Sequence, residues 1–406
     1  MGKRSKRQNK DPLELKNMAK TLEAFGLRQH QSDDKKSSGP VEASSVRKHG
    51  DPKMADVLAE ALAASDKVER GTHPFHTYPA RMHPDSARLI IPHTQGAVHD
   101  PFCGGGTVLI EAKMAGRKAY GSDISPIAHL VAQARLADPE LASPMRKASR
   151  RIADKAKLRI DVEVPEVCIP WYQHHVAQEI GRIRDGIKEQ PPEIRPLLNA
   201  VLSSILVKAS FRKSDTSNKM EKHHRRPQST AILFHKKARE FARMLESMPA
   251  EPSSTLIHGD ARNVVPPKKV GLVLTSPPYP GVYDYLPMHQ LRYAWLGIEP
   301  ENSLGQEIGS RRNFRSKGRT DALKNWMDDT DRWIKMQASI LEPGGAMIIV
   351  VGDGLVAGKL VDALYPTAEA MKRAGLEIFS RASADRPDHA RNAIRIEHMV
   401  MAVKPT

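Results

Sequence analysis

The sequence predicts an α/β protein built on a doubly wound sheet with a parallel core, and a repeated strand and helix pattern favours this fold class. AVHDPF (residues 97–102) has the apolar pattern of a short strand, TVLIEAKMAG (107–116) that of a helix, and KAYGSDI (118–124) that of a second strand. This alternation is typical of parallel sheets. STLIHGDA (254–261), GLVLTS (271–276) and GGAMIIVVGD (344–353) predict further strands, and GLEIFSRA with RIEHMVMAVK predicts an antiparallel pair near residue 400.

Two segments do not follow this pattern. Residues 1–50 lack sustained periodicity and predict a disordered basic arm, followed by a helix at MADVLAEALAAS. Residues 140–250 contain four stretches with helical periodicity, separated by prolines and by the polar segment FRKSDTSNKMEKHHRRPQ. We expect this region to be a helical insertion, so that residues 51–139 and 251–406 form the α/β domain.

The positive charge of the chain is concentrated in these same two segments. The net charge is +16, and residues 1–50 hold 12 Lys and Arg against 6 Asp and Glu, while residues 140–250 hold 22 against 13. The remaining surface is close to balanced. This distribution favours a polyanionic partner bound by the arm and the insertion. The alternative is that the lysines only keep two peripheral segments soluble.

The composition is that of an ordinary globular protein in a reducing compartment. No apolar run is long enough to span a bilayer, and MGKRSKRQNK is not followed by the apolar core of a signal peptide. The two cysteines, Cys103 and Cys168, are too few for a disulfide framework or a cysteine-type zinc site. We therefore expect a cytoplasmic protein without a membrane partner; the oligomeric state is left open.

A glycine turn between the first strand and its helix is the first candidate site. In Asp100-Pro101-Phe102-Cys103-Gly104-Gly105-Gly106-Thr107 the glycines permit a tight turn, and the following helix start offers free N–H groups to a carboxylate or phosphate. Asp123 ends the next strand, where an acidic side chain in nucleotide-binding folds accepts hydrogen bonds from ribose hydroxyls. The spacing fits neither a dinucleotide fingerprint nor a P-loop.

With these residues in place, the sequence resembles the DNA amino-methyltransferases, which methylate exocyclic amines of cytosine or adenine with S-adenosylmethionine. DPFCGGGT resembles their cofactor motif, TSPPY (275–279) resembles their catalytic motif, and HPFHTYPARMHPDSARLII (73–91) is similar to the segment that packs beside the methionine moiety of the cofactor. The resemblance implies a class I methyltransferase fold. It also implies a cofactor site at Asp100, Phe102, Gly104, Gly106, Thr107, Asp123, Ile124 and Asp260.

The same resemblance assigns a catalytic role to Ser276, Pro277, Pro278 and Tyr279. The Ser276 hydroxyl and the Pro277 carbonyl would accept hydrogen bonds from the target amine, whose lone pair then becomes available for attack. The prolines would fix the loop in advance. Tyr279 would stack on an extruded base, and Tyr283 is a further candidate to contact it. Serine in the first motif position favours cytosine N4 within this family.

Several neighbouring residues have more than one interpretation. Asp260 either reaches the cofactor adenine, as the family implies, or belongs to an ordinary turn. His174-His175 and His223-His224 are adjacent pairs without ligands at metal spacing, so we expect no metal site. Cys103 is expected to be a packing residue, because the Pro-Cys motif of cytosine C5 enzymes is absent.

Two basic loops are candidates for holding the nucleic acid. One spans residues 212–226 and includes Arg225 and Arg226; the other, GSRRNFRSKGRT, includes Arg311, Arg312 and Arg315 and could lie over the pocket. Both could instead be solvated loops. The expected activity is methylation of cytosine N4 in DNA. Its rivals are the same chemistry on RNA or on adenine N6, and a non-catalytic nucleic-acid-binding protein that retains a relic cofactor fold.

Overall fold

The computed structural model describes residues 41–76, 78–79, 81–215, 217–299, 306–316, 318–356, 359–388 and 393–406. Most of the predicted basic arm, residues 1–40, lies outside the described residues. The prediction is wrong for its last part, because Arg47–Gly50 form strand β1, which pairs antiparallel with β11 (Glu377–Asp388) at the edge of the main sheet. The reason is packing: Val46 is buried in the core beneath this strand.

The main sheet confirms the predicted fold class. In the part of the chain that the structure describes, its eight strands lie in the order β1-β11-β12-β8-β7-β2-β3-β6, and β6, β3, β2, β7 and β8 are joined by parallel pairings. Strand β12 runs antiparallel between β8 and β11, which adds one strand to the doubly wound order of nucleotide-binding folds. The bounds are β2 Val98–Asp100, β3 Ala119–Asp123, β6 Thr255–His258, β7 Val270–Thr275, β8 Leu341–Gly352 and β12 Ala393–Val403.

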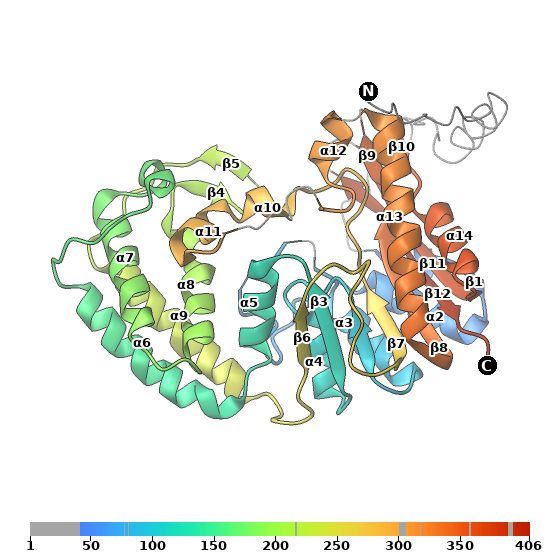
Figure 1. The fold of residues 1–406 in the computed structure, drawn as a ribbon, viewed down its shortest axis with the longest axis horizontal. Coiled ribbons are helices and arrows are strands. Elements are labelled where there is room, and N and C mark those ends of the chain that lie inside the picture. Colours follow the sequence, from blue (N-terminus) through green and yellow to red (C-terminus); the bar gives the residue numbers. More distant parts are fainter. Residues whose placement is uncertain are drawn as a thin grey trace, which may run out of the picture.

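Helices cover both faces of this sheet, which explains why its central strands are almost wholly apolar (Figure 1). Leu272 and Leu274 face a core shared with α2 (Pro52–Ala63), α3 (Pro84–Ile90) and α4 (Thr107–Met114), whereas Val273 faces α13 (Arg319–Ile340) and α14 (Leu364–Arg373). Helices α13 and α14 were not predicted. Ala322, Trp326, Trp333 and Gln337 on α13 are buried at helical spacing, so the signal was present among its many charged residues.

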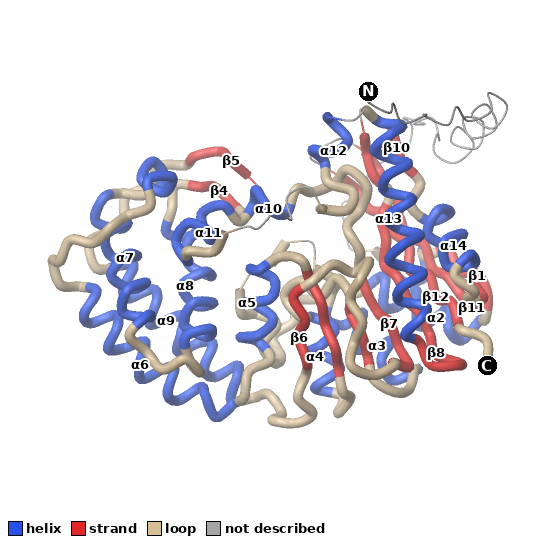
Figure 2. The backbone as a smooth tube through the Cα atoms, viewed as in Figure 1, coloured by secondary structure: helices blue, strands red, loops and turns tan. Residues whose placement is uncertain are grey.

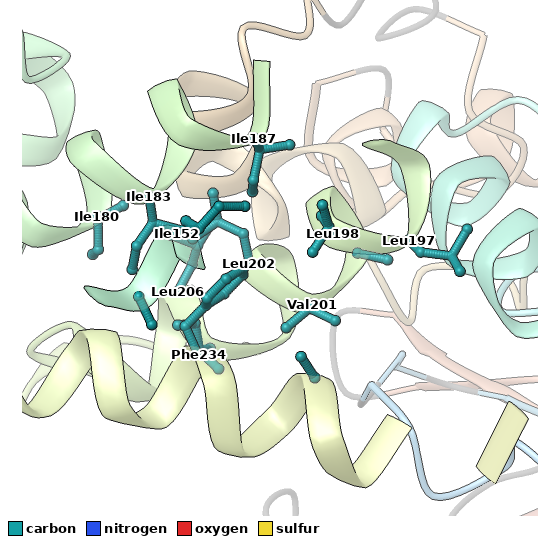
Figure 3. Packing of buried hydrophobic residues seen from close by; sticks show 14 of the residues in the cluster. Ile152, Ile180, Ile183, Ile187, Leu197, Leu198, Val201, Leu202, Leu206 and Phe234 are labelled. Atoms are coloured by element: carbon teal, nitrogen blue, oxygen red, sulfur yellow. The ribbon is translucent and has the colours of Figure 1, made fainter. Parts of the chain in front are cut away.

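The predicted helical insertion forms a second lobe. Its helices are α6 (Ala142–Ala156), α7 (His174–Lys188), α8 (Arg195–Ala209) and α9 (Ser229–Glu246), and Figure 2 shows that helices dominate this lobe whereas the large sheet lies in the other. The four helices enclose a core of their own, in which Ile152, Ile183, Leu202 and Phe234 meet (Figure 3). The polar segment between α8 and α9 forms the hairpin β4 (Arg212–Ser214) and β5 (Ser217–Met220).

The two lobes meet through segments that flank the candidate site. Helices α10 (Tyr285–Met288) and α11 (Gln290–Leu296) lie beside the insertion (Figure 1), and Trp295 is fully buried in its core. Phe75 stacks on Phe241 of α9 with ring centroids 3.7 Å apart. The remaining α-helices and strands of the described residues are α5 (Pro126–Arg135), α12 (Arg311–Ser316), β9 (Gly354–Val356) and β10 (Lys359–Val361). No helix in the described ranges is both long and apolar enough to cross a membrane.

Trp295→Ala is expected to lower the free energy of unfolding by about 3–5 kcal/mol, because it opens a cavity where α11 enters the core of the insertion. Urea denaturation followed by circular dichroism measures this. Ile232→Ala on α9 is the matched control, since that side chain is 58% exposed and its loss should change stability by less than about 0.5 kcal/mol. Equal effects of the two substitutions would contradict the assigned packing.

Candidate active site

Two adjoining cavities lie at the carboxyl ends of the parallel strands. The first cavity is lined by Tyr78, Asp100, Phe102, Gly104, Gly105, Thr107, Asp123, Ile124, Asp260, Ser276, Pro278, Tyr283 and Tyr285, among others. The second cavity is lined by residues that include Ser276, Pro277, Tyr279, Tyr283, Tyr285, Arg386, Arg395 and Glu397. Ser276 and the tyrosines Tyr283 and Tyr285 contribute to both, so the two cavities share a wall.

Asp100 joins the ends of two neighbouring strands. It ends β2, and its carboxylate accepts a hydrogen bond from the Thr275 hydroxyl at the end of β7 (2.6 Å) and from the Phe102 N–H (3.1 Å). Burial raises the pKa of Asp100 to about 7. The side chain therefore ties the glycine turn to the TSPPY loop and remains partly protonated near neutral pH.

The glycine turn has the backbone geometry that its residues predict. Gly104 and Gly106 have φ of +49° and +80°, in the left-handed region where glycine is favoured. The Gly104 N–H donates to the Asp123 carboxylate (2.9 Å), and Gly106 leads into α4. Gly106 itself is absent from the lining of the first cavity; a side chain there would press on Ala132. The next residue, Thr107, lines the cavity with a buried hydroxyl that has no protein partner among the described residues.

Asp123 ends β3 on the opposite side of the glycine turn. Its second carboxylate oxygen accepts a hydrogen bond from the Ser125 N–H (2.8 Å), and burial raises its pKa. Ile124 beside it is half-buried and lines the same cavity. The structure thus brings Asp100, Asp123 and Ile124 together around the glycine turn, as expected for neighbouring parallel strands.

Asp260 also lines the first cavity, but its carboxylate is engaged within its own turn. It accepts hydrogen bonds from the Arg262 backbone N–H (2.8 Å) and from Arg262 Nε (3.0 Å), and Arg262 also pairs with Asp329 of α13 (2.6 Å). These carboxylates raise the pKa of Arg262. These contacts are those expected of an ordinary turn. Asp260 also lies at the cavity wall, so its contact with the cofactor adenine stays a prediction.

The TSPPY loop separates the two cavities. Pro278 faces the first cavity, whereas Pro277 and Tyr279 face the second. The Tyr279 hydroxyl donates a hydrogen bond to Glu397 of β12 (2.9 Å). The sequence assigned a role only to the ring of Tyr279, and nothing in it linked this residue to Glu397, 118 positions away.

Most of the candidate arginines contact other parts of the protein and do not stand free to bind phosphate. Within the predicted basic loop GSRRNFRSKGRT (309–320), residues 311–316 form helix α12, and its arginines support the segment after the TSPPY loop: Arg311 donates to the Val282 carbonyl, and Arg312 to Glu307 (2.7 Å). Arg225 donates to the Lys208 carbonyl within the insertion. Only Arg226 and Arg315 of this set are exposed, and none of the five lines either cavity.

Arg135 at the end of α5 is a supporting residue that the sequence analysis missed. Its fully buried guanidinium donates to the Gly105 carbonyl (2.8 Å) and to the carbonyls of Phe75 (2.8 Å) and His76 (2.7 Å). Burial lowers its pKa to about 9. This side chain fastens the glycine turn to the segment before it. A lone arginine at the end of a helix carries no sequence signal for such a role.

The described residues contain no group of three or more His, Cys, Asp or Glu side chains arranged to hold a metal ion. His174, His175, His223 and His224 lie in the insertion, where His175 contacts the Arg225 carbonyl (2.9 Å). Cys103 is buried beside the glycine turn, and burial raises the pKa of its thiol.

No protein-family profile matches this chain. The chain is 24% identical to the type II methyltransferase M.MvaI of Kocuria varians over 62% of each protein, so it spans less than two thirds of that relative's length. Among solved structures, it is similar to an S-adenosylmethionine-dependent methyltransferase of Methanosarcina mazei (9% identity, 78% of this chain and 97% of the other, TM-score 0.32). It is also similar to a Thermus thermophilus protein assigned as a DNA modification methylase (24% identity, 36% and 51%, TM-score 0.24).

The strand order and the position of the glycine turn define the fold class. Strand β12 lies antiparallel between β8 and β11, and the first cavity lies at the carboxyl ends of β2 and β3. This arrangement is the class I S-adenosylmethionine-dependent methyltransferase fold. The relative of 24% identity carries the name of a methyltransferase.

Arg135→Met is expected to lower the free energy of unfolding by at least about 3 kcal/mol, because several buried carbonyls lose their donor together. Arg135→Lys should lie between this variant and the wild type, since one ammonium cannot reach all the acceptors. Urea denaturation measures both. The control is Arg150→Met, an exposed arginine on α6. A wild-type-like Arg135→Met would show that the glycine turn does not depend on this guanidinium.

Proposed function

We propose that this chain transfers a methyl group from S-adenosylmethionine to an exocyclic base amine in DNA, and that the amine is N4 of cytosine. The observation that carries the proposal is the position of Ser276. It stands in the wall between a cavity that contains the glycine turn and a second cavity that contains Tyr279. A group at this point can contact a base in one cavity while a methyl donor occupies the other.

S-adenosylmethionine is the cofactor, and the first cavity suits it. When bound, it supplies a methyl group activated by a sulfonium. Asp123 presents carboxylate oxygens for the ribose hydroxyls, Ile124 an apolar surface for the adenine, and the unpartnered Thr107 hydroxyl at the start of α4 a donor for the carboxylate. Tyr78 and Met82 bring the 73–91 segment to the same cavity. We propose Asp100, Phe102 and Gly104 as the floor of this site, with Gly106 shaping the turn.

The chain's own residues then prepare the base amine for attack. The amine lone pair is delocalised into the ring, and acceptors for its two N–H groups favour the tetrahedral geometry in which the nitrogen becomes nucleophilic. Ser276 Oγ and the Pro277 carbonyl are the proposed acceptors. The consecutive prolines fix them in advance, so no rearrangement is needed during reaction. A bound S-adenosylmethionine would supply the methyl group, with its sulfur leaving as a thioether, and the proton released by the amine would pass by way of Ser276 Oγ to solvent.

The second cavity is the proposed site of the target base. Tyr279 and Tyr283 supply aromatic surface for an extruded base. The phosphates are proposed to lie on exposed cations outside the cavities, including Lys219, Lys222 and Arg226 of the insertion and Arg315 of α12. The name of the relative from Kocuria varians supports a methyltransferase, and serine in the motif supports cytosine N4.

The raised pKa of Asp100 predicts that cofactor affinity depends on pH. Without ligand the group is largely protonated below about pH 7. A bound cation favours the carboxylate and lowers this pKa, so binding releases protons below pH 7, and affinity should rise toward pH 7 and then level off. Calorimetry at pH 6 in buffers of different ionisation enthalpy measures the released protons. Asp100→Asn should abolish that component. Equal proton release in both proteins would contradict the assignment.

The function is tested by mass spectrometry of nucleosides after incubation of S-adenosylmethionine and the protein with DNA or with RNA. N4-methylcytosine in DNA is the expected product. Ser276→Ala should slow methyl transfer in a single turnover by about a hundredfold or more, as for loss of one preorganised hydrogen-bonding group, and leave cofactor affinity unchanged. N6-methyladenine or a methylated RNA base would reassign the target. Cofactor binding without any methylated product would favour a non-catalytic nucleic-acid-binding protein that retains a relic cofactor fold.

A further inference from the structure

The Tyr279 side chain is fixed at its hydroxyl end by a chain of three residues from different elements. Its hydroxyl donates to Glu397 Oε1 (2.9 Å), and the other carboxylate oxygen, Oε2, accepts from Arg386 Nε of β11 (2.9 Å). Arg386 also donates to the carbonyl of Leu62 at the end of α2. Arg386 is therefore held by the Leu62 carbonyl, and each oxygen of the Glu397 carboxylate accepts a hydrogen bond.

The ring of Tyr279 is fixed along one side by the sheet. A side chain at Gly352 of β8 would place its Cβ 2.5 Å from Tyr279 Cε2, so the ring packs directly on the glycine. Gly352 is the register partner of Glu397 on the neighbouring strand. The two contacts on Tyr279 therefore come from paired positions of the same sheet, one at the hydroxyl end of the ring and one along its side.

The protonation of Tyr279 is consistent with this arrangement. Burial raises the pKa of its phenol well above 10, the Glu397 carboxylate raises it further, and a hydrogen bond with the Ser276 side chain acts in the opposite direction. The phenol is thus neutral over the physiological range and donates to the carboxylate. A hydrogen bond to an ionised acceptor is stronger than one between neutral groups.

We infer that Glu397 is a positioning residue of the target-base cavity, which sets the orientation of Tyr279 through the phenol hydroxyl. This inference rests on the proposed function, because it assigns to Tyr279 the surface on which the base stacks. Glu397 and Arg386 line the same cavity as Tyr279 and Ser276. Stacking is most favourable when the ring is held in place before the base arrives, and a ring whose hydroxyl end is free to shift would leave the amine misaligned with Ser276.

The test is a set of single-turnover methylation rates at saturating S-adenosylmethionine, with DNA from a methylase-free bacterial strain. Glu397→Ala should slow methyl transfer on the order of tenfold, as for loss of a hydrogen bond to a charged group. Glu397→Gln should be milder, since its amide oxygen can still accept from the phenol. In a Tyr279→Phe background, both substitutions should have less than about a twofold further effect, because the contact is already lost.

The affinity for S-adenosylmethionine, measured by calorimetry, should be the same in all these variants, since the first cavity is untouched. Glu377→Gln is the matched control: it is an exposed glutamate at the far end of β11, outside both cavities, and should behave as wild type. A full effect of Glu397→Ala in the Tyr279→Phe background would overturn the inference and indicate direct contact of Glu397 with the base. An unaltered rate for Glu397→Ala would overturn it as well.

A second measurement separates failure of this inference from failure of the proposed function. In protein labelled with 3-fluorotyrosine, the resonance missing from Tyr279→Phe identifies Tyr279, and it should shift in Glu397→Gln but not in Glu377→Gln. This readout needs neither DNA nor turnover, and Glu397→Gln is close in size to the native residue. Absence of any methylated product from the wild type would reject the function alone. An unshifted Tyr279 resonance would reject the positioning role alone.

Discussion

The hydrogen bond between Thr275 and Asp100 connects the two halves of the site. Strands β2 and β7 are parallel neighbours, so their carboxyl ends lie at one edge of the sheet, and the loops that follow them start side by side. The buried Asp100 carboxylate bridges these ends by accepting from the Thr275 hydroxyl at 2.6 Å and from the Phe102 N–H. One loop continues into the glycine turn of the first cavity and the other into Ser276, which borders both cavities. The separation between the two cavities is therefore set by the spacing of adjacent strands.

Arginines contribute to this site mainly by holding the loops and side chains that form it. Arg135 satisfies buried carbonyls around the glycine turn, Arg262 neutralises Asp260 and Asp329, and Arg386 holds Glu397. A guanidinium suits this work because its several donors lie in one plane and remain charged. The cationic side chains of the protein thus fall into two groups. Some cations are buried within loops and stabilise them, and others, such as Arg226 and Arg315, remain exposed and available to a polyanion.

The insertion is attached where its packing can affect the cavities. Phe75 precedes the glycine turn and stacks on Phe241, and the His76 ring lies 2.9 Å from the Ser203 hydroxyl of α8. His76 adopts a positive φ of 59°, which is uncommon for a residue other than glycine. Trp295 of α11 is buried in the same insertion core. A region expected to contact nucleic acid is thus packed directly against both segments that lead into the site.

The sequence alone determined the parallel core, the four helices of the insertion, and the placement of the two motifs at strand ends. These features depend on local patterns: apolar runs, helical periodicity, and glycines and prolines at turns. It also assigned Asp100, Asp123 and Ser276 to strand ends, and the parallel pairing of these strands brings the three residues to a common edge of the sheet. Tertiary structure decided the rest. Glu397 reaches Tyr279 across 118 residues, Arg135 reaches the glycine turn across 30, and strand β1 joins a sheet edge more than 300 residues away. Such contacts depend on which surfaces the folded chain brings together, and side-chain charge or spacing does not encode them.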